Sequence, residues 1–245
     1  MLDGVASFDL GTATQVFNAA RNAADERLYD VRVCTADGGP VRASGGFTVT
    51  PEYGPSVLDE VDTVVVPGVH GEFFVGGVPV FRDVEVAALR RIPATTRVVS
   101  ICTAAFALAQ VGRLDGRPAT THWMYVDQFR RLYPHVRLNP DVLFVDDGDM
   151  LTSAGVGAGV DLCLHVVRRD FGSEVANRAA RRSVMPPWRD GGQAQFIVRH
   201  VPDPAGSSTA PARAYALENL DAPLDLDTLA RQCRMSVRTF TVLRT

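Results

Sequence analysis

The sequence predicts an α/β fold: a mostly parallel sheet sandwiched by helices, followed by a partial all-α segment. Residues 63–67 (TVVVP) form a continuous β-branched run, and residues 97–101 (RVVSI) resemble a second buried strand; both are typical of parallel strands buried on both faces. Segments with helical periodicity separate the predicted strands, as in parallel crossover units. The composition changes after residue 200, where Pro, Gly, Ser and Ala dominate. We therefore divide the chain into residues 1–200, a linker at residues 201–212, and residues 213–245.

The first elements follow from local patterns. Residues 1–8 resemble the end of a strand with a turn at Asp3-Gly4. A buried strand needs about five or six residues, so this one seems to begin in its middle. Apolar residues on one face predict a helix over residues 9–24, and alternation predicts a strand over residues 28–35. A short hairpin is expected where Gly45-Gly46 precedes residues 47–50.

The remaining elements complete the sheet and its cover. The buried strands at 63–67 and 97–101 precede a hairpin whose turn contains Asp147-Gly148, with its arms at residues 142–145 and 150–153. Helical patterns cover residues 84–91, 104–111, 125–133, 155–171 and 174–182. Strands alternating with helices favour one sheet with both faces covered.

Composition excludes several classes of protein. The net charge is -3 over 245 residues, and all 25 basic residues are Arg, so no global basic field indicates nucleic-acid binding. The four Cys are far apart in sequence, which argues against a disulfide framework and a structural zinc site. Reduced thiols fit a cytoplasmic protein. No apolar run reaches about 18 residues and no signal peptide is recognisable, so we expect no membrane contact, no metal and no cofactor.

The strongest local feature is Cys102, which stands where a buried strand ends and a helix begins with almost no loop. Such a turn forces a tight backbone conformation and projects the side chain from the sheet edge. Helix dipoles aimed at the sulfur would lower its pKa and favour the thiolate. Parallel sheets also bind ligands at the carboxyl ends of their strands. We expect Cys102 to form the floor of a small-molecule pocket; the alternative is a buried, inert thiol.

Other candidate residues lie at neighbouring positions. Asp9 begins the first helix, where it either caps that helix or leans over the same sheet edge as Cys102. His122 is a candidate base near the thiol; alternatively Thr121 caps a helix and His122 packs against its neighbour Trp123. The last candidates follow the strand at 63–67: the amides of Gly68 and Val69 could form an anion hole, and the loop of His70 is expected to line the pocket.

The end of the chain has the outline of a helix-turn-helix. Helices are expected over residues 214–220, 226–233 and 237–245, with Asp225 and Ser236 as N-caps. Four Arg cluster within the last part of the chain, and a recognition helix uses such residues for phosphate and base contacts. We expect DNA contacts from Arg234, Ser236, Arg238 and Thr239; the alternative is a solvated helical face.

Several of these motifs resemble one family. Cys102-Thr103 at the elbow, Asp9-Leu-Gly, the Thr-Thr-His-Trp segment ending at Trp123 and the Thr-Ser-Ala-Gly segment ending at Gly155 look like the ThiJ/PfpI class, which has the class I glutamine-amidotransferase-like, flavodoxin-like fold. The version here is similar to the sensor domain of AraC-type transcription regulators, in which a helix-turn-helix module follows. The resemblance implies a small-molecule ligand, DNA and a homodimer.

The resemblance also implies an alternative function. Relatives with Asp, Cys and Thr at these positions are similar to isonitrile hydratases, which add water to a carbon–nitrogen triple bond. Cys102 would then be the nucleophile, Asp9 the proton donor and Thr103 an orienting hydroxyl. A dedicated hydrolase does not need residues 201–245, so we favour the regulator.

The sequence departs from the family's pattern in several places. Ala104 stands where the elbow usually carries Gly, and no His follows Cys102 directly, which argues against an amidotransferase-type dyad. AraC-type modules hold two helix-turn-helix units, whereas this sequence ends inside the first. We therefore expect a fragment or a frameshifted product, and specific DNA binding by this chain as it stands is in doubt.

Overall fold

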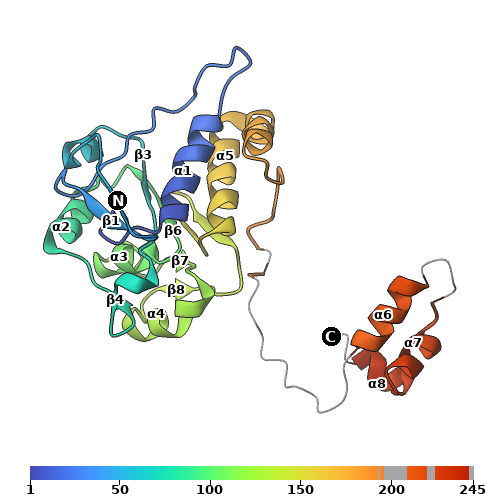
Figure 1. Cartoon of the computed structure of the whole chain (residues 1–245). Helices are drawn as coiled ribbons and strands as arrows, with labels where there is room; N and C mark the ends of the chain where they lie inside the picture. Colours follow the sequence, from blue (N-terminus) through green and yellow to red (C-terminus); the bar gives the residue numbers. More distant parts are fainter. Residues whose placement is uncertain (193, 196–208, 220–223, 243–245) are drawn as a thin grey trace. The chain divides into compact units, whose positions relative to one another are not determined.

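The central sheet is built from the two β-branched runs and the later hairpin (Figure 1). In the computed structural model its strand order is β3 (Thr63–Val66), β6 (Arg97–Ile101), β10 (Met150–Ser153) and β9 (Phe144–Asp147). β6 pairs in parallel with both β3 and β10, while β9 is antiparallel to β10. This register confirms the mostly parallel sheet.

The structure describes residues 1–192, 194–195, 209–219 and 224–242. The chain divides into two compact units, residues 1–197 and 198–245, and each is described here by itself. Within the described ranges, no helix is both long and apolar enough to cross a membrane.

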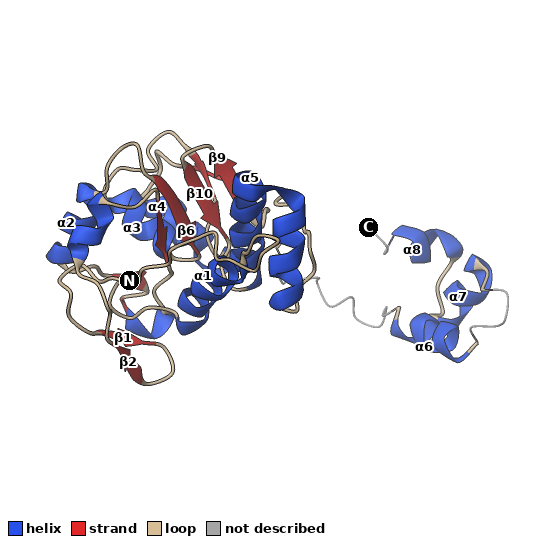
Figure 2. Cartoon of the chain, turned by 90° about the horizontal axis from the view of Figure 1, so that it is seen from above, coloured by secondary structure: helices blue, strands red, loops and turns tan. Residues whose placement is uncertain are grey.

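Helices cover both faces of the sheet, as Figure 2 shows. α1 (Ser7–Ala19) and α5 (Gly157–Arg182) pack on one face, together with the side chains of Val99, Ile101 and Leu151. On the other face, the core contains Val98 and residues of three helices. These helices are α2 (Asp83–Arg91), α3 (Ala104–Gln110) and α4 (Val126–Leu132). Because each face buries one set of alternating strand residues, the predicted flavodoxin-like sandwich is confirmed.

α5 joins the two helices that the sequence predicted at 155–171 and 174–182. Gly172 interrupts it with non-helical backbone angles, φ 83° and ψ 171°. Glycine adopts this positive φ without a Cβ penalty, so the break lies where the two predicted helices were divided.

The N-terminal elements differ from the predictions. α1 begins at Ser7 and ends at Ala19 rather than spanning residues 9–24. Beyond it, the Asn22 side chain accepts hydrogen bonds from the amides of Ala24 and Glu26, and such local bonds favour a turn over a helix. The expected first strand is reduced to single bridges from Val5 to Ala43 and to Val69.

The prediction of a strand at residues 28–35 is wrong. This segment has only a single bridge, between Cys34 and Tyr53. Its side chains alternate in exposure as predicted, with Asp30 and Arg32 exposed and Val31 half-buried. An extended segment becomes a strand only when a neighbouring backbone pairs with it, and a cavity separates this segment from β3.

The shorter elements complete the first unit. β1 (Val41–Ala43) and β2 (Phe47–Val49) form the hairpin predicted at Gly45-Gly46. The other short elements are η1 (Pro55–Asp59), η2 (Gly71–Phe73), β4 (Phe74–Val75), β5 (Val78–Pro79), β7 (Pro118–Ala119), η3 (Trp123–Tyr125) and β8 (Arg137–Leu138).

The second unit contains the helices expected at the end of the chain. α6 (Ala210–Glu218) begins inside the linker predicted at residues 201–212. Pro211 lies in its first turn, where proline is tolerated and does not stop the helix. Residues 201–208 of that linker lie outside the described residues. α7 (Leu226–Gln232) is capped by Asp225 as predicted. α8 (Val237–Val242) follows, and residues 243–245 lie outside the description.

Candidate functional site

Cys102 occupies the strained turn that the sequence predicted. β6 ends at Ile101, α3 begins at Ala104, and Cys102 lies between them with φ 60°. A positive φ is uncommon for a residue with a Cβ and persists only where the surroundings impose it. Here the Cys102 amide donates to the Ser153 carbonyl at 3.0 Å, and the Thr121 hydroxyl donates to the Cys102 carbonyl at 3.0 Å. The tight conformation of the elbow is confirmed.

Gly155 lies directly against Cys102. A Cβ at Gly155 would come within 2.3 Å of the Cys102 Cβ and 2.6 Å of its Sγ, and Gly155 itself has φ 84°. Only glycine fits both the backbone angle and the space. Gly155 closes the Thr-Ser-Ala-Gly motif, so the sequence contained a signal for it, although it was not among the predicted site residues.

Asp9 is buried in the first turn of α1 but does not cap that helix, whose N-cap residue is Ala6. Its Oδ1 instead accepts a hydrogen bond from the Val156 amide, just before α5, at 3.2 Å. Burial raises the pKa of the Asp9 carboxyl to about 6, while the amides of Val156 and Gly68 act in the opposite direction. The capping alternative is therefore wrong, and the carboxyl leans over the sheet edge.

Three of the predicted residues converge on Gly68. A Cβ at Gly68 would lie 2.8 Å from Asp9 Oδ2, 2.9 Å from Thr103 Oγ1 and 3.0 Å from the Cys102 Cβ. Cys102 and Thr103 are adjacent at the turn between β6 and α3, while Asp9 comes from α1, so the fold brings the carboxyl to the thiol and the hydroxyl. A carboxyl, a hydroxyl and a thiol thus share one small volume at the carboxyl end of the parallel sheet.

The Val69 amide, one of the two amides predicted to form an anion hole, already has an acceptor. Val69 donates its amide to Thr103 Oγ1 at 2.8 Å, and the same hydroxyl donates to the Val69 carbonyl at 2.7 Å. Gly68 faces the Asp9 carboxyl, and the Gly68 amide helps to lower the pKa of that carboxyl. Since the Val69 amide already has an acceptor within the protein, it is not free for a developing anion. Thr103 instead ties the elbow to the end of β3.

The predicted thiolate is also contradicted. Burial first, and the charge of Asp9 second, raise the pKa of the Cys102 thiol to about 12. Hydrogen bonds from Thr103 lower it, but α3 offers too little to overcome the loss of water and the neighbouring carboxylate. At neutral pH the thiol is therefore protonated.

Neither predicted histidine contacts the thiol. His122 caps η3, where its Nδ1 accepts from the Met124 amide at 3.3 Å, and its ring stacks on Trp123 with centroids 5.7 Å apart. Burial lowers the pKa of His122. The packing alternative is thus confirmed, with His122 itself as the cap rather than Thr121. His70 is exposed, and its Nδ1 accepts from the Glu72 amide at 3.4 Å.

Tyr125 and Gln195 are neighbours of the site that the sequence did not reveal. The Tyr125 hydroxyl lies 2.5 Å from the position that a Cβ at Gly71 would take. Burial is the main cause of the raised pKa of the Tyr125 phenol, and nearby Cys102 is the second cause. Gln195 is buried and donates to the carbonyls of Thr121 and Pro140. No local pattern distinguishes either residue, because their roles depend on segments distant in sequence.

Two cavities of the first unit lie away from Cys102. One of about 350 Å³ and one of about 50 Å³ have been located, and Cys102 lines neither. A pocket above Cys102 therefore stays a prediction. Within the described parts of the chain, no group of three or more His, Cys, Asp or Glu side chains is arranged to hold a metal ion.

The predicted DNA-contacting residues are all exposed in the second unit: Arg234, Ser236, Arg238 and Thr239. Ser236 caps α8, since its Oγ accepts from the Thr239 amide at 3.1 Å. Arg234 has φ 53° in the turn between α7 and α8. Ala230 and Cys233 are buried beneath this turn. The geometry is that of two helices joined by a short turn, and DNA contact stays a prediction.

Comparisons with known proteins identify relatives of two kinds. Over 243 residues the chain is 28% identical to the HTH-type transcriptional regulator GbdR of Pseudomonas aeruginosa, covering 97% of this chain and 64% of that protein. It is 30% identical over 196 residues to the isonitrile hydratase of Pseudomonas putida, covering 76% of this chain and 82% of that enzyme. The chain thus spans somewhat less than two thirds of the regulator's length.

Solved structures share the fold. A crystal structure of an AraC family transcriptional regulator from Pseudomonas putida matches with a TM-score of 0.63 and 22% identity, over 74% of this chain and 94% of that one. The DJ-1/PfpI family model matches residues 1–169. These residues include the whole parallel sheet and the convergence of Asp9, Cys102 and Thr103. The chain belongs to the DJ-1/PfpI family.

Proposed function

We propose that this chain is part of a transcription regulator, in which residues 1–197 sense a small molecule near Cys102 and α6–α8 belong to a DNA-binding module. The observation that carries this proposal is the joining of a DJ-1/PfpI unit to the α7–turn–α8 pair in one chain. The similarity to an HTH-type regulator over 97% of the chain supports it. A homodimer in the cytoplasm is part of the proposal.

A protonated thiol suits sensing better than nucleophilic catalysis. The thiolate is the reactive form of cysteine, and burial keeps the Cys102 pKa far above neutrality. The Asp9 carboxyl, with a pKa of about 6, changes its charge between pH 5 and pH 7. A ligand that donates a hydrogen bond to the carboxylate, or accepts one from the acid, would alter this balance. Differential binding of that kind shifts a conformational equilibrium.

A mobility-shift assay tests the DNA-binding part. The chain, extended by a complete C-terminal module, is mixed with promoter fragments from around its own gene. Arg234→Ala and Arg238→Ala are expected to weaken DNA binding. Each lost phosphate contact should also reduce the slope of log affinity against log salt concentration by about one. Arg21→Ala, in the first unit, is the matched control. No retardation of any fragment would refute the regulator.

A second candidate function is a hydratase. The convergence of Cys102, Asp9 and Thr103 and the identity to an isonitrile hydratase favour it. The Cys102 sulfur would add to the substrate carbon while Asp9, protonated below its pKa of about 6, gives a proton to the substrate and recovers one from the thiol. A water molecule would then attack the same carbon and release the thiol, so that the net change is the addition of one water.

Thiol labelling separates the two candidates. At pH 7 we expect iodoacetamide to label Cys102 more slowly than a model thiol, with Cys102→Ser as the blank. Faster labelling, together with turnover of an isonitrile that Cys102→Ser abolishes, would establish the enzyme and overturn the sensor.

A further inference from the structure

A short segment beyond α5 is fixed to the first unit by alternate residues. We call residues 189–192 and 194–195 the latch. Its residues that point inward, buried or half-buried, are Arg189, Gly191 and Gln195, and those between them are exposed. The second unit begins at residue 198, shortly beyond the latch. The latch is therefore the last described part of the first unit before the chain reaches the second.

Gln195 holds the segment that supports the Cys102 elbow. Its Nε2 donates to the carbonyls of Pro140 at 2.8 Å and Thr121 at 3.2 Å, and its Oε1 accepts from the Trp123 amide at 3.1 Å. The Thr121 hydroxyl in turn donates to the Cys102 carbonyl at 3.0 Å. Because Gln195 is buried, its loss would leave these groups without partners. One side chain thus fixes the residue that holds the elbow.

Arg189 holds the other side of the site. Its Nε donates to Asp161 Oδ1 at 3.0 Å and its Nη2 donates to Asp161 Oδ2, which makes a two-point pair with a buried carboxylate. The same Nη2 lies 3.3 Å from the position of a Cβ at Gly157, the first residue of α5. The preceding residue, Val156, donates its amide to Asp9 Oδ1 at 3.2 Å. Arg189 therefore covers the turn that binds the Asp9 carboxyl.

Gly191 brings the backbone of the latch against β9. Its carbonyl accepts from the Leu143 amide at 2.8 Å, and a Cβ at Gly191 would come within 2.6 Å of the Phe144 ring. Only a glycine allows so close an approach. The Leu143 carbonyl accepts from the Ala154 amide at 2.8 Å, and the next residue, Gly155, lies against Cys102. A third set of contacts thus connects the latch to the elbow.

We propose that Arg189 and Gln195 are positioning residues for the site at Cys102, and that the latch couples this site to the second unit. The inference rests on the proposed function, because it names the route by which an occupied site reaches the DNA-binding helices. A ligand that displaces Thr121 or Val156 weakens the latch. Loss of the latch in turn loosens the site, since coupling between two sites is reciprocal.

Hydrogen exchange of backbone amides in the full chain tests the coupling from the latch to the site. Gln195→Leu keeps most of the side-chain volume but removes the amide, and Arg189→Leu removes the guanidinium. We expect each variant to speed exchange at the amides of Cys102 and Val156 at least about tenfold by local opening, with the β3–β6 ladder unchanged.

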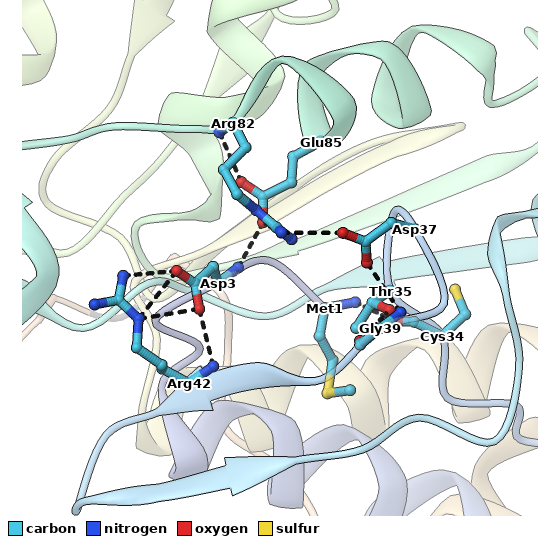
Figure 3. A network of polar contacts seen from close by, with 9 residues as sticks. All are labelled: Met1, Asp3, Cys34, Thr35, Asp37, Gly39, Arg42, Arg82 and Glu85. Carbon is cyan, nitrogen blue, oxygen red and sulfur yellow. Dashed lines mark hydrogen bonds and ion pairs between the residues drawn. The ribbon is translucent and has the colours of Figure 1, made fainter.

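The ion pair of Arg82 with Glu85 supplies the matched control for Arg189 (Figure 3). The Glu85 carboxylate is buried, and Arg82 Nη2 lies 3.1 Å from its Oε1. None of the hydrogen bonds described for this pair reaches the elbow. Arg82→Leu should therefore leave exchange at the site unchanged. For Gln195 the control is Gln110→Leu, because Gln110 is an exposed glutamine at the end of α3.

A chemical group on Cys102 tests the coupling in the opposite direction. Iodoacetamide at high pH attaches a carbamidomethyl group to the sulfur, and Cys34→Ser removes the other half-buried thiol. The attached group should speed exchange at the amides of Trp123 and Leu143, which donate to Gln195 and Gly191. Cys102→Ser treated in the same way is the blank. Unchanged exchange at both amides would contradict the coupling.

Two results with the latch variants would overturn the proposal. One is unchanged exchange at Cys102 and Val156, since the latch would then be anchored without positioning the site. The other is equally faster exchange throughout β3 and β6, since both residues would then stabilise the whole unit. No readout uses DNA. Lost coupling with DNA retardation intact refutes this inference alone, and preserved coupling without retardation refutes the regulator alone.

Discussion

The two edges of β3 differ in how closely the surrounding chain fits them. On the inner side, β6 pairs with β3, and at its carboxyl end a single added carbon on Gly68 would meet three side chains within 3.0 Å. On the outer side lies a cavity of about 350 Å³. The same short strand thus borders a crowded part and an open part of the first unit. Local fit, rather than burial alone, decides what a substitution there costs.

The largest effect is expected on the crowded side, at Gly155. Gly155→Ala places a Cβ within 2.3 Å of Cys102, on a residue with φ 84°. Steric overlap and backbone strain together should reduce the free energy of unfolding by about 4 kcal/mol. Gly148→Ala is the matched control, because Gly148 has φ 81° and open space around it; it should cost about 1 kcal/mol. Urea denaturation measures both, and equal costs would contradict the crowding.

Asp9 should make stability depend on pH. Its carboxyl has a pKa of about 6 when folded and 3.8 ordinarily. Because folding raises the pKa of this carboxyl, protonation of Asp9 stabilises the folded state. This stabilisation is complete below about pH 4 and is lost as the pH rises to 6. Relative to Asp9→Asn, the free energy of unfolding should therefore fall by about 3 kcal/mol over that interval. Denaturation of both proteins at pH 4, 5, 6 and 7 tests this, and a constant difference would refute it.

Thr103 should contribute through its two bonds to Val69. Thr103→Val keeps the shape but leaves the Val69 amide and carbonyl without their partner, at a cost of about 2 kcal/mol. Thr14→Val is the control, since the Thr14 hydroxyl only donates to carbonyls within its own helix. Thermal unfolding should separate the two variants clearly. A similar loss in both would show that the connection from the elbow to β3 is unimportant.

The smallest effect is expected on the open side. Ala13 lines the cavity beside β3, so Ala13→Leu can fill empty space and should change stability by less than about 0.5 kcal/mol. Ala105, fully buried in α3, offers no such space, and Ala105→Leu should cost about 2 kcal/mol. If Ala13→Leu is as costly as Ala105→Leu, the two sides of β3 do not differ in packing.

Much of the architecture followed from local pattern. The β-branched runs predicted β3 and β6 because strands buried on both faces are rich in apolar, β-branched residues. The elbow at Cys102 followed from the absence of a loop between strand and helix. Asp225 and Ser236 were recognised as caps because that role depends only on residues within one turn.

The tertiary structure decided the remaining properties. The Cys102 thiol is protonated because Asp9 and the burial of the site arrive from elsewhere in the chain, whereas the sequence suggested only the dipole of α3. Residues 28–35 carry the pattern of a strand but lack a neighbour to pair with. The amide of Val69 is already occupied by the Thr103 hydroxyl. A sequence determines which groups are available, while the fold determines their partners and their contact with water, and these fix the charge of each group.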